Sequence, residues 1–290
     1  MKFFANNWFL LGVGVAIIGS CGASGQKKNQ QQNAKTQTVE QTKENKKPEK
    51  VKEIALPSGY KRLPADSGSF AFFLQKLSLK KDSLVRLFNG QLKLNQSAQY
   101  AIIDIDVGSR DLQQCADAVM RLRAEYLFET KQFDKIKFHF TSGHLAEWSK
   151  YAQGYRAKIS GNTVTWVKTA TPDNSYTCFR QYMDLVFSYC GTKSMNNEVS
   201  SISIKEIKPG DVFHETGNPY GHAITVMDVA QDSTGNPIFL LAQSYMPAQD
   251  IHILINPTNT KLNPWYSLKE GQSLITPEWH FPSGSLKRWK

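Results

Sequence analysis

The chain begins with a short apolar run that ends in a cysteine, and this run limits which residues can belong to the folded domain. Residues 8–20 are almost wholly apolar, follow the basic residue Lys2, and close with Ile-Gly-Ser-Cys, which ends at Cys21. A basic start, a short apolar stretch and small residues at the cleavage point are typical of a secretory signal peptide. A cysteine at that point receives a lipid, so we expect a lipoprotein signal peptide over residues 1–20 and lipidation of Cys21.

A plain transmembrane helix is the alternative interpretation of the same run. Residues 3–20 are short for a bilayer span, which takes about 20 apolar residues, and they include Asn6 and Asn7. We therefore favour a bacterial lipoprotein held in a membrane by the lipid on Cys21. Gly22 stands where an aspartate retains some lipoproteins in the inner membrane. This favours the outer membrane, on its periplasmic face or at the cell surface.

Residues 21–55 are predicted to be a disordered tether. They are rich in Lys, Gln, Asn, Glu and Thr and hold few apolar side chains, so burial cannot offset their ordering entropy. Residues 56–290 are then left as a single globular domain, a length that supports one well-buried core. The formal net charge of +10 lies partly in the tether. No nucleic-acid-binding motif accompanies it, so we expect no nucleic-acid partner.

The pattern of the remaining chain indicates an α+β fold, with N-terminal helices and a C-terminal antiparallel sheet. Ser69 is a predicted helix cap, Asp111 caps the longest helix with Gln114 in capping-box position, and Gly191 ends a third helix. The predicted helices cover residues 70–77, 111–130, 145–152 and 176–190, and the predicted strands cover residues 100–107, 135–140, 163–169, 202–207, 211–214, 222–230, 237–244 and 251–255.

Three cysteines lie in the predicted domain, Cys115, Cys178 and Cys190. Cys178 and Cys190 fall near opposite ends of one predicted helix, about 18 Å apart, and cannot form a disulfide with each other. A nucleophilic cysteine is favoured at a helix N-terminus, where the dipole lowers the thiol pKa. Cys115 and Cys178 meet that criterion, and Cys190 lies at the wrong end. A buried structural thiol is the alternative for each of them.

One histidine lies where a base for such a thiol is expected. His222 begins a predicted strand after the Pro-Gly-Asp turn at 209–211, and Gln243 lies on the next strand, within a few residues of the position facing His222. A catalytic triad needs a thiol, a base that takes its proton and a group that fixes the tautomer of the base. The segment resembles the C-terminal half of papain-like amidases of the NlpC and CHAP kind. The resemblance implies a papain-like fold, with His222 as base and Gln243 as its orienting group.

Cys115 is the preferred nucleophile. In the NlpC pattern the cysteine stands three residues before a helix aromatic, and Cys178 is out of that register because Tyr176 is three residues before Phe179. Gln114, beside Cys115, is a candidate hydrogen-bond donor to an oxyanion. A structural histidine at the sheet edge and a core cysteine remain the alternative interpretation of this pattern.

Two aspartates, Asp104 and Asp106, share one face of the predicted strand over residues 100–107. Asp106 precedes the predicted helix of Cys115 and is a candidate for orienting the active-site groups. A pair of glycosidase carboxylates is the functional alternative, and a solvated polar face is the simpler one. No HExxH or CxxC spacing and no glycine-rich phosphate loop occurs, so we expect no metal and no cofactor.

Longer motifs resemble a known family. They are DIDVGSRDLQQCADAVMRLRAEYLF, FRQYMDLVFSYCGT, GDVFHETGNPYGHAITVMDVA and FLLAQSYMPAQDIHIL, and the resemblance extends over residues 60–289. These motifs resemble a family of Bacteroidetes lipoproteins known as domain of unknown function 4846. The resemblance implies that Cys115, His222 and Gln243 belong to recurring motifs, whereas Cys178 and Cys190 do not. The family has no assigned reaction, so the resemblance implies no activity.

The sequence therefore predicts a cell-envelope lipoprotein with a cysteine-dependent amide hydrolase or acyl transferase that acts on cell-wall peptides. Cys115 is the expected nucleophile, with His222 and Gln243 as its partners. The alternative is a non-catalytic envelope binding or assembly module, in which Cys115 and His222 are packed inside. There, residues 245–249 and the C-terminal tryptophans form a partner groove. The expected partners are the membrane, through the lipid on Cys21, and peptidoglycan or an envelope protein.

Overall fold

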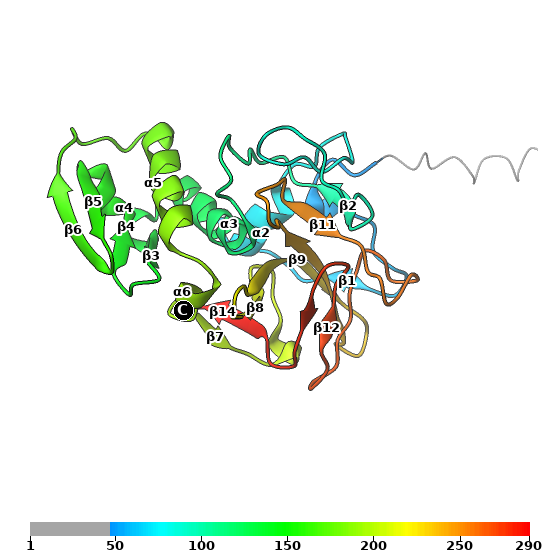
Figure 1. Ribbon diagram of the computed structural model, residues 1–290. Coiled ribbons are helices and arrows are strands. Elements are labelled where there is room, and N and C mark those ends of the chain that lie inside the picture. Colours follow the sequence, from blue (N-terminus) through cyan, green and yellow to red (C-terminus); the bar gives the residue numbers. More distant parts are fainter. Residues whose placement is uncertain (1–46) are drawn as a thin grey trace, which may run out of the picture. The chain divides into compact units, whose positions relative to one another are not determined.

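An antiparallel sheet of eight strands forms the centre of the fold in the computed structural model, which describes residues 47–290 (Figure 1). Seven strands lie in the order β2-β11-β10-β9-β8-β14-β7, and β1 pairs with β9 outside this path. The strands are β1 Lys61–Arg62, β2 Gln99–Ile102, β7 Val199–Ser201, β8 Val212–Glu215, β9 His222–Gln231, β10 Pro237–Gln243, β11 His252–Leu254 and β14 Leu286–Trp289. The predicted late antiparallel sheet is confirmed, and it includes β2 from the first half of the chain.

Helices and small hairpins complete an α+β fold, as predicted. The helices are α2 Phe70–Lys76, α3 Cys115–Glu129, α4 Trp148–Ala152, α5 Tyr176–Tyr189 and α6 Thr192–Met195, with 3-10 helices η1 Val51–Glu53, η2 Phe133–Lys135 and η3 Ile204–Glu206. The hairpins pair β3 Lys137–His139 with β4 Leu145–Glu147, β5 Tyr155–Ser160 with β6 Thr163–Lys168, and β12 Leu274–Ile275 with β13 His280–Phe281. None of the helices in residues 47–290 is long and apolar enough to cross a membrane. The predicted signal peptide, Cys21 and the tether up to residue 46 lie outside the described residues.

The longest helix, α3, starts later than predicted. The sequence pattern favours Asp111 as its cap, but the Asp111 carboxylate instead accepts the backbone N–H of Ala248 at 2.7 Å and the side-chain amide of Gln114 at 3.1 Å. Gln114 is the N-cap, and its backbone N–H donates to Asp117 Oδ2 at 3.0 Å. Cys115 is therefore the first residue of α3, where the helix dipole acts most strongly.

Two predicted elements have a different type. Residues 202–207, predicted as a strand, contain the 3-10 helix η3, because the Ser203 hydroxyl accepts a backbone N–H at the start of a helical turn. Residues 145–152, predicted as one helix, form strand β4 and then helix α4. Pairing with β3 holds β4 in an extended conformation. Strand pairing thus decides the conformation of residues 145–147, although their local sequence pattern favours a helix.

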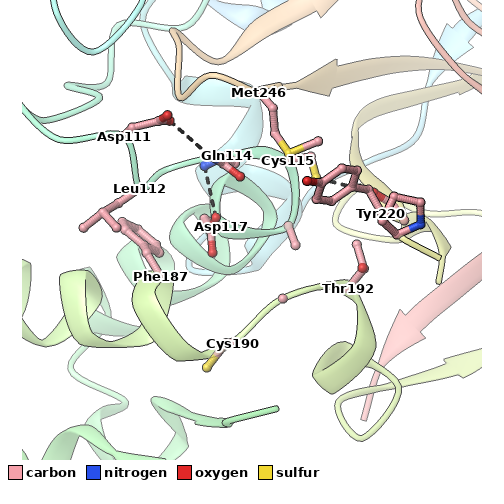
Figure 2. Close-up of a pocket in the computed structure, with 14 residues that line it drawn as sticks. Asp111, Leu112, Gln114, Cys115, Asp117, Phe187, Cys190, Thr192, Tyr220 and Met246 are labelled. Atoms are coloured by element: carbon pink, nitrogen blue, oxygen red, sulfur yellow. Dashed lines mark hydrogen bonds between the residues drawn. The ribbon is translucent and has the colours of Figure 1, made fainter. Parts of the chain in front are cut away.

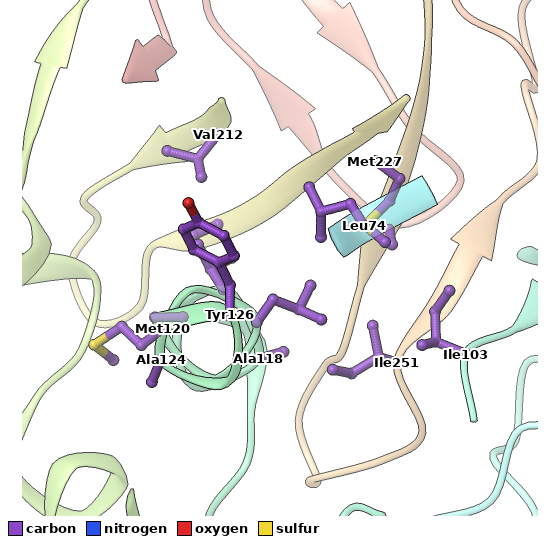
Figure 3. Packing of buried hydrophobic residues seen from close by; sticks show 14 of the residues in the cluster. Leu74, Ile103, Ala118, Met120, Ala124, Tyr126, Val212, Met227 and Ile251 are labelled. Carbon is purple, nitrogen blue, oxygen red and sulfur yellow. The ribbon is translucent and has the colours of Figure 1, made fainter. Parts of the chain in front are cut away.

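Hydrophobic side chains pack on both sides of β9. Successive residues of a strand point to opposite faces. Ala223 and Met227 belong to one buried cluster, and Ile224 and Val226 belong to a second one. The first cluster contains residues of α2 and α3 (Figure 3). The second contains aromatic side chains of other strands, Phe213, Phe239 and Phe281. Helix α3 thus packs on one side of β9, with Cys115 at its start.

The packed domain begins inside the segment that the sequence predicts as tether. Val51 and Ile54 are fully buried in the first cluster. The indole Nε1 of Trp265 donates to the carbonyl oxygen of Ala55 at 2.8 Å. The sequence pattern does not reveal that Val51 and Ile54 are core residues, because lysines and glutamates surround them. Residues 47–55 are thus part of the described structure.

We expect Ile54→Ala to lower the free energy of unfolding by about 2–5 kcal/mol, because the truncation leaves a cavity in a buried cluster. Leu94→Ala is the matched control, since Leu94 is fully exposed, and its expected effect is within about 0.5 kcal/mol. Urea denaturation followed by tryptophan fluorescence measures both. Equally small effects of the two substitutions would contradict a structural role for Ile54.

Candidate active site

His222 and Gln243 form a hydrogen bond at one end of the central sheet. His222 is the first residue of β9, and Gln243 is the last residue of β10. The register of this strand pair shifts between Leu240 and Leu241. The His222 ring nitrogen Nε2 and Gln243 Oε1 lie 2.9 Å apart. The structure thus brings these two predicted site residues together.

Glu278 determines how the Gln243 amide is oriented. Gln243 Nε2 lies 2.7 Å from Glu278 Oε2, and a carboxylate oxygen accepts hydrogen bonds but cannot donate them. The Gln243 NH2 group must therefore face Glu278, and its carbonyl oxygen must face His222. Because that oxygen only accepts, His222 Nε2 carries the ring proton and Nδ1 keeps a free lone pair. Nδ1 makes no hydrogen bond within residues 47–290.

Lys93 and Asn95 hold Glu278 in place. Lys93 Nζ lies 2.5 Å from Glu278 Oε2, and Asn95 Nδ2 lies 3.0 Å from Glu278 Oε1. The side chains of Lys93 and Glu278 are only 6% and 12% exposed, so this ion pair is largely removed from water. Burial lowers the pKa of Lys93, and Glu278 opposes that shift. A continuous series of polar contacts therefore runs from Lys93 through Glu278 and Gln243 to His222.

Aromatic rings enclose His222. The ring centroids of Tyr245, Trp279 and Phe281 lie 5.1, 5.0 and 5.6 Å from that of His222. Only 1% of the His222 surface is exposed. Burial lowers the His222 pKa to about 4, although the hydrogen bond to Gln243 acts in the opposite direction. His222 is therefore neutral at neutral pH.

Cys115 lies against the backbone on both sides of His222. Its Sγ is 3.9 Å from the carbonyl oxygen of Gly221. Backbone N–H groups, that of Ala223 among them, act on the sulfur and favour the thiolate. Burial outweighs them and, together with the charge of Asp117, raises the Cys115 pKa to about 11. The thiol is therefore protonated at neutral pH.

A cavity of about 220 Å³ opens at Cys115 (Figure 2). Its walls come from the start of α3 and the residues before it, from the end of α5 and the turn into α6, and from the segment that leads into β9. The lining residues are Asp111, Leu112, Gln114, Cys115, Ala116, Asp117, Phe187, Cys190, Gly191, Thr192, Pro219, Tyr220, Gly221 and Met246. Cys115 is the candidate nucleophile that faces this space.

Cys115 and His222 are not joined by a hydrogen bond in the described part of the chain. Cys115 belongs to the cluster on the α3 side of β9, whereas His222 stacks on Phe281 of the second cluster. The sulfur reaches the backbone at Gly221, where β9 begins, rather than the imidazole. The thiol and the imidazole therefore have to approach each other before a proton can pass directly between them.

Gln114 and Asp106 lie in different surroundings from those that the sequence suggests. Gln114 lines the cavity, but its side-chain amide donates to Asp111 at 3.1 Å. Asp104 and Asp106 do not share a strand face, because β2 ends before them at Ile102. Asp106 is exposed, and its carboxylate lies 3.8 Å from Arg180 in a separate groove. Asp106 therefore does not line the Cys115 cavity.

The other two cysteines are free thiols, as is Cys115. Cys178 lies in the first turn of α5, and its Sγ is 4.0 Å from Arg156 Nη2. Burial raises the Cys178 pKa. Cys190 is the C-cap of α5 and lines the cavity, and burial raises its pKa well above the ordinary value. Neither position offers a thiolate that is stabilised at neutral pH.

Lys93, Glu278 and Asp117 are site residues that the sequence patterns do not reveal. Lys93 and Glu278 are 185 positions apart, so no local pattern connects them. Asp117 carries a weak signal, because it stands three residues after the cap residue Gln114. Within residues 47–290, no group of three or more His, Cys, Asp or Glu side chains is placed to hold a metal ion.

The chain belongs to the family described as "Domain of unknown function (4846)", whose model matches residues 51–288. Membership of this family of unknown function, predicted from the long motifs, is therefore confirmed, whereas the match does not test the prediction of a Bacteroidetes lipoprotein. The match begins at Val51, a fully buried residue of the described domain. No curated protein and no solved structure matches the chain. The family description assigns no reaction.

The stability of the fold is expected to depend on the buried histidines as pH falls. Burial lowers the His252 pKa to about 3, and Lys93 and His222 add to the shift. This folded-state pKa lies below the unfolded value of about 6.5, so the unfolded chain binds more protons as pH falls below that value. We expect His252→Gln to reduce the loss of unfolding free energy between about pH 7 and pH 4 by about 3 kcal/mol.

Urea denaturation across this pH range measures the unfolding free energy of each protein. The compared quantity is the change of this free energy with pH, and not its value at one pH. His280→Gln is the matched control, because His280 is exposed. Its pH dependence should equal that of the unchanged chain. Parallel stability curves for His252→Gln and the unchanged chain would contradict a neutral, buried His252.

Proposed function

We propose that this protein is a papain-like, cysteine-dependent amide hydrolase or acyl transferase that acts on cell-wall peptides. Cys115 is the nucleophile, His222 the base, and Gln243 the group that orients the base. The observation that carries the proposal is the 2.9 Å hydrogen bond from His222 Nε2 to Gln243, which leaves Nδ1 free to accept a proton. A nucleophile needs a base held in this way. The helix start and the cavity at Cys115 supply the other parts of the site.

In the proposed reaction, His222 Nδ1 accepts the thiol proton as Cys115 Sγ attacks the carbonyl carbon of an amide. Backbone N–H groups in the first turn of α3 have no partner within the helix and can donate to the resulting oxyanion. The imidazolium then gives its proton to the leaving amine, the C–N bond breaks, and a thioester remains. Water or a second amine attacks the thioester and releases Cys115, which gives hydrolysis or acyl transfer.

The resting pair in this reaction is neutral rather than ionic. The pKa values of about 11 for Cys115 and about 4 for His222 make proton transfer between them unfavourable before a substrate binds. Catalytic hydrogen bonds that are long or missing in a free enzyme commonly form only in its substrate complex. In the proposed reaction, the approach of the sulfur to the imidazole therefore accompanies substrate binding.

The proposed location is the outer membrane, with the protein anchored by a lipid on Cys21. The support lies in the sequence: an apolar run, small residues before the cysteine, and a polar segment after it. A lipid anchor of this kind holds a domain at a membrane surface. Peptidoglycan is the partner that such a location offers to an amide-cleaving site, and an envelope protein is the other.

A non-catalytic envelope binding or assembly module is the second candidate. It is favoured by the burial of Cys115, which is 8% exposed, and by its raised pKa, because a packed thiol has both properties. Of the residues predicted to form its partner groove, Gln249 and Trp265 are buried, whereas Trp279 and Trp289 are partly exposed. In this alternative the cavity at Cys115 holds a ligand without breaking a bond.

We expect the full-length chain to release new amino groups from purified peptidoglycan peptides. Cys115→Ala should abolish the release, and His222→Ala should slow it about 100-fold or more through loss of the base. Cys178→Ala is the matched control, because Cys178 also lies in the first turn of a helix but outside the cavity. It should retain the full rate. Fluorescamine detection of new amines measures all four proteins.

Alkylation with iodoacetamide provides a readout that does not depend on the substrate. We expect the folded chain to be labelled at Cys115, slowly at pH 7 and faster as the pH rises toward the Cys115 pKa of about 11, because only the thiolate reacts. Mass spectrometry of the digested protein locates the label. No release of amines together with labelling of Cys115 only after denaturation would refute the enzyme and favour the binding module.

A further inference from the structure

The cavity at Cys115 has acidic side chains and no basic ones. Asp111 and Asp117 line it, and no lysine, arginine or histidine stands among its lining residues. The chain as a whole has a formal net charge of +10, so this lining is opposite in character to the rest of the protein. Acidic walls around a small space favour a cationic group.

Asp117 has one carboxylate oxygen without a partner. Its Oδ2 accepts the Gln114 backbone N–H at 3.0 Å and caps the helix. Its Oδ1 is buried and has no hydrogen-bond partner among the described residues, and the whole residue is only 6% exposed. A buried polar atom left unpaired costs free energy. Burial also raises the Asp117 pKa well above its ordinary value. Helix capping accounts for one oxygen and leaves the other unexplained.

The surroundings of Asp117 do not supply the missing partner. Figure 2 shows it on the first turn of α3, with Phe187 and Cys190 on the neighbouring segment. The Asp117 charge is close enough to raise the pKa of both Cys190 and Cys115. Asp117, with its buried unpaired oxygen, therefore lines the same cavity as the candidate nucleophile Cys115.

We propose that Asp117 binds a primary ammonium group, and that the ligand of the cavity is a short peptide with a free amino group close to the amide at Cys115. The role given to Cys115 rests on the proposed function, whereas the binding of the amine does not. Cys115 and Asp117 are the first and third residues of α3 and line the same cavity, so one small ligand can contact both. The volume of about 220 Å³ suits a small fragment, since pockets for drug-sized ligands exceed about 300 Å³.

A bound ammonium also affects the nucleophile. An opposite charge beside Asp117 favours the ionised carboxylate and cancels its repulsion of a thiolate at Cys115. A ligand with a free amino group therefore lowers the barrier to ionisation of the thiol that attacks it. A peptide with a blocked amino group lacks this effect. The Asp117 site thus favours ligands with a free amino group in two ways: they bind more tightly, and they make the Cys115 thiol easier to ionise.

Two probes that differ only in the ammonium group test the site: L-alanyl-L-alanine amide, and propionyl-L-alanine amide, in which hydrogen replaces the amino group. Isothermal titration calorimetry uses the full-length chain with Cys115→Ala, which prevents turnover.

We expect the alanyl probe to bind about tenfold more tightly or better, as charged hydrogen bonds imply. Adding Asp117→Asn, which keeps an acceptor for the Gln114 N–H, should reduce the ratio to about one. Adding Asp111→Asn is the matched control and should leave the preference.

Equal affinity for the two probes, binding of neither, or a preference that survives Asp117→Asn would overturn the ammonium site. Release of amines by the chain with Cys115 intact is measured separately. Turnover without the amine preference refutes the ammonium site alone. The amine preference without turnover of any cell-wall peptide refutes the enzyme and leaves the ammonium site standing.

Discussion

The orientation of one amide, that of Gln243, decides what His222 can do. Glu278 can only accept a hydrogen bond from Gln243, so the Gln243 oxygen has to face the imidazole at 2.9 Å. A reversed amide would place the ring proton on Nδ1, and His222 could not take a proton from a thiol there. The buried Lys93 holds Glu278 in position, and adjacent strand ends bring His222 and Gln243 together. Segments far apart in the chain therefore cooperate in selecting one tautomer.

Burial of His222 and Cys115 opposes the formation of charge on either side chain. It lowers the His222 pKa to about 4 and contributes most to raising the Cys115 pKa to about 11. Both groups are therefore neutral at neutral pH, and the proposed reaction needs a ligand that changes their electrostatics. The unpaired oxygen of Asp117 offers a way to do this, because a cation bound there favours negative charge at Cys115. In the proposed mechanism, substrate recognition and activation of the thiol are one event.

Local patterns predict much of this fold, and long-range contacts explain what they miss. The cap at Ser69, the helix α5 and the strands β8 to β10 follow from caps and hydrophobic periodicity within short segments. The pairing of His222 with Gln243 is predictable because a hairpin joins their strands. The start of α3 cannot be predicted from local sequence, because the Asp111 carboxylate accepts a hydrogen bond from the distant backbone N–H of Ala248 instead of capping the helix.

The His222 tautomer can be measured directly by long-range ¹H–¹⁵N NMR of the full-length chain labelled with ¹⁵N-histidine. Comparison with His222→Gln identifies the signals of His222. At pH 7 we predict a neutral ring with the proton on Nε2 and an unprotonated Nδ1. In Glu278→Gln this preference should weaken, because the new amide can donate as well as accept. A proton on Nδ1, or an imidazolium at pH 7, would contradict the role of Gln243 and Glu278 in preparing His222 as a base.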